Sequence, residues 1–197
     1  SKFFPEGVKN ATKDYCSIAN KHHFDRLVAA LEGAVSGGAK IACGGEKNQE
    51  SLHLSPAVLT GVKYDNPIMQ EEIFGPILPI IKVKNLEESI NYINNNEKPL
   101  ALYLFSNNPS VQSLVLKNTS SGGMVINDCV LHHMNPNLPF GGINNSGVGS
   151  YHGKFGFDAF SHHKAVLKSS PMSPFKIMLP PYTKTKESLA NLIKKYF

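Results

Sequence analysis

The middle of the chain alternates between strand-like and helix-like segments, and this alternation constrains the fold more than any other feature. Apolar runs typical of buried strands occur at residues 77–84, 100–105 and 123–127. Between them, residues 86–93 and 110–117 carry apolar side chains at helical spacing. A β-α-β-α-β series implies an α/β fold with a largely parallel sheet covered by helices. If neighbouring strands are adjacent, right-handed crossovers place both helices on one face of the sheet.

Other signals mark where helices begin and end. Asn85, with Glu88 three residues later, resembles a capping box at the start of the first helix of the series. An earlier amphipathic helix is predicted to start at Ser17 and to stop at the Gly-Gly pair 37–38. Its apolar face is expected to consist of Phe24, Leu27, Val28, Leu31 and Val35.

Two flanking regions complete the expected organisation. Extended segments are predicted at residues 40–42 and 52–59, separated by the polar turn GGEKNQES. From Ser169 onward, several prolines favour an extended segment. A short basic helix is predicted to follow it, with the apolar residues Leu189, Leu192, Ile193 and Phe197.

Composition excludes several classes of protein. The 197 residues, 41% hydrophobic and 18% charged, have the balance of a soluble globular chain. The net charge of +5 comes mostly from lysines spread along the chain, so we expect no nucleic-acid binding. We find neither an apolar run of the roughly 18 residues needed to cross a bilayer nor a signal peptide. Three widely separated cysteines suggest a reducing compartment and neither a disulfide framework nor a zinc site: Cys16, Cys43 and Cys129.

Two segments contain residues suited to chemistry. In MQEEIFGPILPI (69–80), a carboxylate can accept two hydroxyl hydrogen bonds, as in ribose recognition, and Phe74 offers a stacking face. The alternative is that Glu71 and Glu72 form a solvated turn and Phe74 belongs to the core.

The second segment, 138–166, contains six glycines among aromatic residues, but its GVGSYHG stretch does not meet the GxGxxG phosphate-binding pattern. We expect no metal site, since adjacent histidines do not both point easily at one ion. The histidines considered are 132, 133, 152, 162 and 163.

The motifs MQEEIFGP, LPFGG and NSGVGSYHGKFGFDAFSH resemble those of the aldehyde dehydrogenase family in order and spacing. YHGK…FSH and KPLALYLFS are similar to its class 3 and fatty-aldehyde branch, and the resemblance runs from about Asp14 to Pro181. It implies that residues 1–168 are the C-terminal part of a parallel-sheet, three-layer catalytic domain. Residues 169–197 would form a proline-containing extension with a basic C-terminal helix.

The resemblance also implies site residues. By carry-over, Glu72 binds the nicotinamide ribose hydroxyls of NAD or NADP, and Phe74 flanks the nicotinamide ring. Four positions in and after the loop that follows residue 127 resemble the wall of the aldehyde tunnel: Val130, Leu131, His132 and Phe140.

The family oxidises aldehydes to carboxylic acids through a cysteine nucleophile in a Gly-Gln-x-Cys type motif, with a general-base glutamate. Neither motif occurs in this sequence. We therefore expect the chain to be a portion of such an enzyme that is inactive alone, acting in the intact protein on aliphatic, fatty or aromatic aldehydes. The alternative is a truncated, non-catalytic subunit that serves as a structural or partner-binding module.

Partners and location follow from the same resemblance. We expect a homodimer in the intact protein and an association with membranes through the C-terminal region. The expected location is intracellular, either in the cytoplasm or at the cytosolic face of an organelle membrane.

Overall fold

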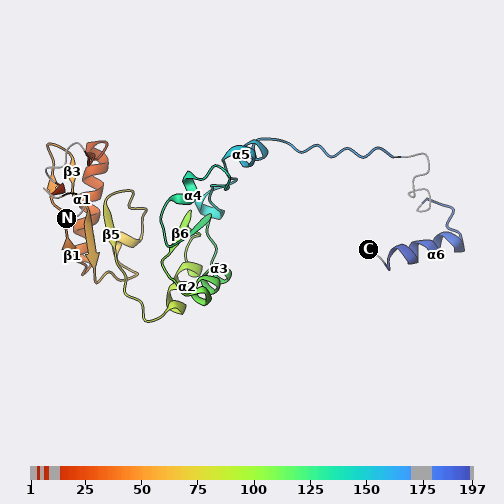
Figure 1. Cartoon of the computed structure of the whole chain (residues 1–197), viewed down its shortest axis with the longest axis horizontal. Helices are drawn as coiled ribbons and strands as arrows, with labels where there is room; N and C mark the ends of the chain where they lie inside the picture. Colours follow the sequence, from red (N-terminus) through yellow and green to blue (C-terminus); the bar gives the residue numbers. More distant parts are fainter. Residues whose placement is uncertain (1–3, 5–6, 9–13, 170–178, 196–197) are drawn as a thin grey trace. The chain divides into compact units, whose positions relative to one another are not determined.

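The computed structural model describes residues 4, 7–8, 14–169 and 179–195 (Figure 1). The chain divides into two compact units. The first comprises residues 1–97 and 113–119, and the second comprises residues 98–112 and 120–197. The predicted boundary between residues 168 and 169 stays a prediction, because residues 170–178 lie outside the described residues.

Helix α1 (Lys21–Ser36) starts later than predicted from the sequence, because Asn20 is extended and caps it. The Asn20 side chain accepts a hydrogen bond from the His23 amide at 2.9 Å, which satisfies one of the first free N–H groups. Gly37 ends the helix, as predicted. The buried residues of α1 are Phe24, Leu27, Leu31 and Ala34. Val35 is 43% exposed, so its predicted place on the core face is wrong.

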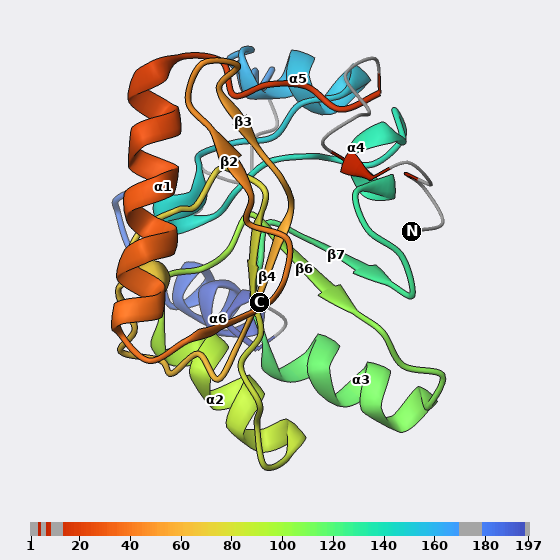
Figure 2. The ribbon, with the colours of Figure 1, turned by 90° about the vertical axis from the view of Figure 1, so that its left-hand side faces the viewer.

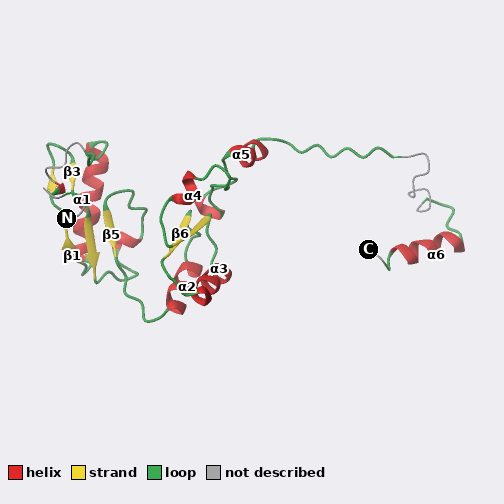
Figure 3. Cartoon of the chain, in the orientation of Figure 1, coloured by secondary structure: helices red, strands yellow, loops and turns green. Residues whose placement is uncertain are grey.

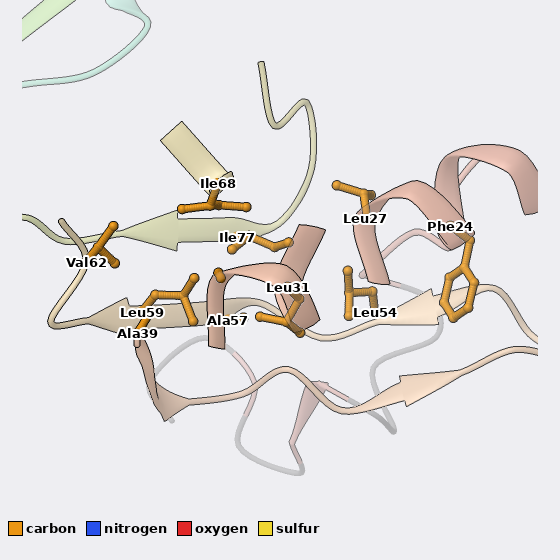
Figure 4. Packing of buried hydrophobic residues seen from close by; sticks show 11 residues of the cluster. Phe24, Leu27, Leu31, Ala39, Leu54, Ala57, Leu59, Val62, Ile68 and Ile77 are labelled. Atoms are coloured by element: carbon orange, nitrogen blue, oxygen red, sulfur yellow. The ribbon is translucent and has the colours of Figure 1, made fainter. Parts of the chain in front are cut away.

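A three-stranded sheet packs with α1 in the first unit (Figure 3). Its strand order is β1 (Lys40–Cys43), β4 (Ala57–Thr60) and β5 (Ile77–Pro79). β1 pairs with β4 antiparallel and β4 pairs with β5 parallel. A separate hairpin joins β2 (Lys47–Asn48) and β3 (His53–Leu54). Figure 4 shows the core between these elements, in which Leu27, Leu54 and Leu59 are almost completely buried.

The strand predicted at 77–84 ends at Pro79 and belongs to the sheet of β1 and β4. The strand at 100–105 belongs to the second unit, so the pairing of these two predicted strands in one sheet stays a prediction. The residues of β4 are alternately buried and partly buried, so this strand offers β5 a partner that joins the core.

Helix α2 (Leu86–Asn95) starts where the sequence predicts. The Glu88 amide donates to the Asn85 side chain at 2.9 Å, and the Glu88 carboxylate accepts from the Lys84 amide at 2.8 Å. This exchange differs from the predicted capping box only in that Lys84 rather than Asn85 donates to the glutamate. Tyr64 also donates to Glu88 at 3.1 Å, and its ring stacks on that of Tyr92.

In the second unit, β6 (Ala101–Leu104) and β7 (Gly123–Ile126) run parallel, as Figure 2 shows. Ala101 pairs with Gly123 at one end and Leu104 with Ile126 at the other. Helix α3 (Pro109–Asn118) lies between them in sequence, which confirms the predicted strand-helix-strand order. The remaining elements are η2 (Pro67–Met69), α4 (Leu131–Met134), η3 (Asn144–Ser146), α5 (Gly153–Ala159) and α6 (Lys184–Ile193).

The basic helix predicted near the C-terminus corresponds to α6, which Thr183 caps. Phe197, assigned to its apolar stripe, lies outside the described residues. Among the residues that the structure describes, no helix has both the length and the apolar character that a membrane crossing requires.

Candidate functional site

The predicted cofactor residues Glu72 and Phe74 lie on a loop, residues 70–76, between η2 and β5. Asn66 fixes the start of this region. Its side chain accepts a hydrogen bond from the Ile68 amide and donates one to the Ala34 carbonyl, both at 3.1 Å in buried surroundings. The segment that precedes the loop is thereby tied to the C-terminal end of α1.

Two successive residues of α1 hold the loop itself. The Arg26 guanidinium donates to the Ile73 carbonyl at 2.7 Å and to the Glu72 carbonyl at 3.4 Å. Gly75 lies against the buried side chain of Leu27, where a Cβ atom would come within 2.7 Å of the leucine Cδ1. The loop is therefore anchored by charged hydrogen bonds at one point and by close packing at the next.

This anchoring directs the two predicted side chains outward. Ile73 packs against the core, whereas Phe74 has a φ angle of 44° and is 84% exposed. A non-glycine residue in the left-handed region is uncommon and needs support from its surroundings. The alternative prediction that Phe74 belongs to the core is therefore wrong.

The Glu72 side chain is exposed and lines a cavity of about 260 Å³. Arg26 of α1 and two glutamates of the loop are the charged residues of a wall that is otherwise apolar. The lining consists of Arg26, Ala29, Ala30, Gly33, Pro67, Ile68, Glu71, Glu72 and Ile73. An exposed carboxylate can accept hydrogen bonds from a diol, and an exposed aromatic ring two residues along the chain offers a face to a planar group.

In the second unit, a polar cluster joins the carboxyl ends of β6 and β7. Asn127 has a φ angle of 61°, and its side chain accepts from the Ser106 amide at 2.8 Å and donates to Asn107 at 3.2 Å. The loop that carries three of the predicted pocket residues starts at this cluster. Open α/β sheets bind ligands at the carboxyl ends of their strands.

The predicted pocket residues differ in exposure. Val130 and Leu131, at the start of α4, are 52% and 51% exposed. Val130 has a φ angle of 66°, which is a strained conformation for a β-branched residue. His132 is only 7% exposed, and its ring packs with Tyr103 and Phe140 at centroid distances of 5.9 and 5.1 Å.

His132 also lies directly over the backbone of β7. A Cβ atom on Gly123 would come within 2.9 Å of the His132 Nε2. Neither ring nitrogen of His132 has a hydrogen-bond partner in the part of the chain that the structure describes. The His132 ring thus packs from α4 onto β7, while Val130 and Leu131 are exposed. All three assignments to the pocket wall stay predictions.

Phe140 is half-buried and exchanges two backbone hydrogen bonds with Tyr151, of 3.1 and 2.9 Å. Its ring contacts those of His133, Tyr151 and His152. This ring cluster was not predicted from the sequence, although the density of aromatic residues near the glycines was a signal for it. A cavity of about 450 Å³ adjoins it, lined by residues between 140 and 151 together with Ala159 and Phe160.

The described residues contain no group of three or more His, Cys, Asp or Glu side chains arranged to hold a metal ion. The thiols of Cys16, Cys43 and Cys129 are free and exposed. The sequence patterns did not single out Arg26 and Gly75, the two residues besides Leu27 that fix the loop. One available signal was that Arg26 is the only arginine among the 20 lysine and arginine residues.

Comparisons with known proteins agree with these observations. The family model described as "Aldehyde dehydrogenase family" matches residues 7–166. Aldehyde dehydrogenase family 3 member A2 of Rattus norvegicus is 46% identical over 198 residues, which cover 98% of this chain and 40% of that protein. Aldehyde dehydrogenase family 3 member H1 of Arabidopsis thaliana is 48% identical and is matched over 92% of this chain and 37% of its own length.

A solved structure titled "Substrate bound state of Staphylococcus Aureus AldH" superposes with a TM-score of 0.85. It is 39% identical, and the match covers 98% of this chain and 41% of that one. This likeness confirms the fold class predicted from the sequence. The chain spans about 40% of the length of the rat relative.

Proposed function

Because the chain belongs to the aldehyde dehydrogenase family, we propose that it supplies the nicotinamide-side cofactor contact of an NAD- or NADP-dependent aldehyde oxidoreductase. The observation that carries this proposal is the anchored loop 70–76, from which the Glu72 carboxylate and the Phe74 ring project. It assigns this chain a binding role, while the nucleophile and the general base come from elsewhere in the intact enzyme.

The residues present fit a nicotinamide nucleotide. In this proposal, the exposed Glu72 carboxylate accepts hydrogen bonds from both ribose hydroxyls and the Phe74 ring covers one side of the nicotinamide. When bound, the cofactor accepts the hydride that the aldehyde carbon loses. Both cofactors occur among similar proteins, in a rat aldehyde dehydrogenase named "dimeric NADP-preferring" and in an NAD-dependent one from Sinorhizobium meliloti.

We assign the second unit to the aldehyde. Val130 and Leu131 would present exposed apolar surface to an aliphatic, fatty or aromatic chain. Phe140 would extend this wall, and His132 would support it from beneath through its ring contact with Phe140.

Partners and location are part of the proposal. The word "dimeric" in the name of the NADP-preferring rat aldehyde dehydrogenase supports a homodimer of the intact protein. Helix α6 has lysines at 184 and 186 and half-exposed Leu192 and Ile193, a pattern suited to a membrane surface. We propose an intracellular location, in the cytoplasm or at the cytosolic face of an organelle membrane.

A direct assay tests the function. The full-length protein that carries this chain and residues 1–197 alone are each incubated with NAD⁺ or NADP⁺ and a series of aliphatic and aromatic aldehydes, and the absorbance of the reduced cofactor is followed. We expect turnover by the full-length protein and none by the chain alone. Turnover by the chain alone that disappears when its thiols are alkylated would show that Cys16, Cys43 or Cys129 is a nucleophile, contrary to the proposal.

A further inference from the structure

We propose that Arg26 is a positioning residue for cofactor binding and hydride transfer, acting through the backbone of the loop that carries Glu72 and Phe74. This inference rests on the proposed function of that loop. Arg26 itself is assigned no contact with the reacting atoms. Its role is to fix where the Glu72 carboxylate and the Phe74 ring stand before the cofactor arrives.

The loop depends on Arg26 because its own backbone makes few hydrogen bonds. Gln70 donates to the Pro67 carbonyl and Ile77 donates to the Gly75 carbonyl. Between these points, residues 71–74 make no backbone–backbone hydrogen bond within the part of the chain that the structure describes. The guanidinium bonds to the Glu72 and Ile73 carbonyls are therefore the polar attachment of this stretch.

Arginine suits this attachment better than lysine. Its guanidinium presents several N–H donors in a rigid plane, so separate nitrogens can bind two neighbouring carbonyls, whereas an ammonium is a compact charge on a flexible stem. Arg26 is the only arginine in the sequence, and all the other residues counted as Lys or Arg are lysines. Asp25, the neighbouring acid on α1, pairs with Lys21 at 2.6 Å.

The attachment also opposes a local strain. Phe74 is held in the left-handed region at a φ angle of 44°. Such conformations persist only where surrounding structure imposes them. The Arg26 bonds fix the two peptide groups just before Phe74, and the contact of Gly75 with Leu27 fixes the residue just after it. Loss of Arg26 should let Phe74 relax, which would turn its ring and move the Glu72 carboxylate.

The first test measures the loop itself and needs no activity. Hydrogen exchange of the Ile77 amide, which donates to the Gly75 carbonyl at the end of the loop, is compared between wild type, Arg26→Gln and Arg26→Lys in the full-length protein. Lys21→Gln is the matched control, since it removes the same charge from the same helix without touching the loop. We expect exchange at least about tenfold faster in Arg26→Gln, an intermediate rate in Arg26→Lys, and no change in the control. Unchanged exchange in both Arg26 variants would overturn the inference.

The second test asks whether Arg26 acts through Glu72. Pre-steady-state formation of the reduced cofactor is measured for Arg26→Gln, for Glu72→Gln and for the double variant. We expect Arg26→Gln to slow this step about tenfold in the wild-type background and less than about threefold in the Glu72→Gln background. A primary isotope effect with deuterated aldehyde should rise in Arg26→Gln.

The outcomes separate the two proposals. An equal effect of Arg26→Gln in both backgrounds, or no effect while Glu72→Gln slows the step, would overturn the inference and leave the proposed function standing. No effect of Glu72→Gln would instead contradict the proposed cofactor contact. If Arg26→Gln does not fold, Arg26→Lys provides the same comparison, because it keeps the charge and a good helix former.

Discussion

Replacing Gly75 by alanine adds one methyl group where the loop meets α1, and the structure allows the cost to be worked out. The new Cβ would lie 2.7 Å from the Leu27 Cδ1 and closer still to Cδ2. Carbon atoms pack best at about 3.5–4.0 Å, so the loop must move by roughly 1 Å. Leu27 cannot yield, because it is only 1% exposed in the core shown in Figure 4. Overpacking of this kind costs about 1–3 kcal/mol.

The free energy of unfolding in urea measures this cost, and two comparisons isolate its cause. Gly33→Ala is the control, since the nearest atom to its Cβ is 4.0 Å away and α1 should gain up to about 1 kcal/mol from the better helix former. In a Leu27→Ala background, which itself costs about 2–5 kcal/mol, the colliding carbons are gone and Gly75→Ala should cost almost nothing. A full cost of Gly75→Ala in that background, or no cost in the wild type, would refute the argument from packing.

Three further predictions concern other parts of the chain. The hydrogen bond from the Lys84 amide holds the pKa of Glu88 below its ordinary value of 4.5, so its stabilisation is present above that pH and is lost as pH falls through the folded pKa. Glu88→Gln should therefore reduce the loss of unfolding free energy in acid, and an unchanged acid dependence would contradict this. His132→Phe should keep the melting temperature or raise it, because it removes two buried ring nitrogens that have no hydrogen-bond partner among the described residues. His132→Ala should lower the free energy of unfolding by about 2–4 kcal/mol, because it leaves a cavity. A phenylalanine variant less stable than the alanine variant would count against this packing. Deleting residues 184–197 should change the oligomer size in gel filtration or the binding to liposomes, and no change in either would reject both roles of the tail.

Most of the features that could be predicted from the sequence depend on residues close together in the chain. The end of α1 at Gly37 and the start of α2 after Asn85 were predicted, because capping depends on a few neighbouring residues, whereas the start of α1 after Asn20 was placed too early. The positions of Glu72 and Phe74 on a loop before a strand also came from adjacent residues. For these features, the information needed lies within a few positions of the chain.

Contacts between distant segments escaped prediction for a physical reason. Arg26 and Ile73 lie 47 residues apart, and nothing in the spacing of either segment specifies that they meet. The pairing of β4 with β5 depends likewise on which faces pack together. The burial of His132 is set by Gly123 and two rings from other segments. The residues next to His132 in the sequence would fit an exposed histidine side chain as well as a buried one.

The most direct test of the proposed cofactor contact is the rate of reduced-cofactor formation in a single turnover of the full-length protein after Glu72→Gln. Losing a charge-assisted hydrogen bond to the ribose should raise the barrier by roughly 1–3 kcal/mol, a slowing of about 5- to 150-fold. Glu71→Gln removes the same charge one residue earlier in the same loop and should slow the step less than about threefold. A large effect confined to Glu72 is the predicted result. Equal effects at the two positions, or an unchanged rate for Glu72→Gln, would contradict the assignment of this loop to the cofactor.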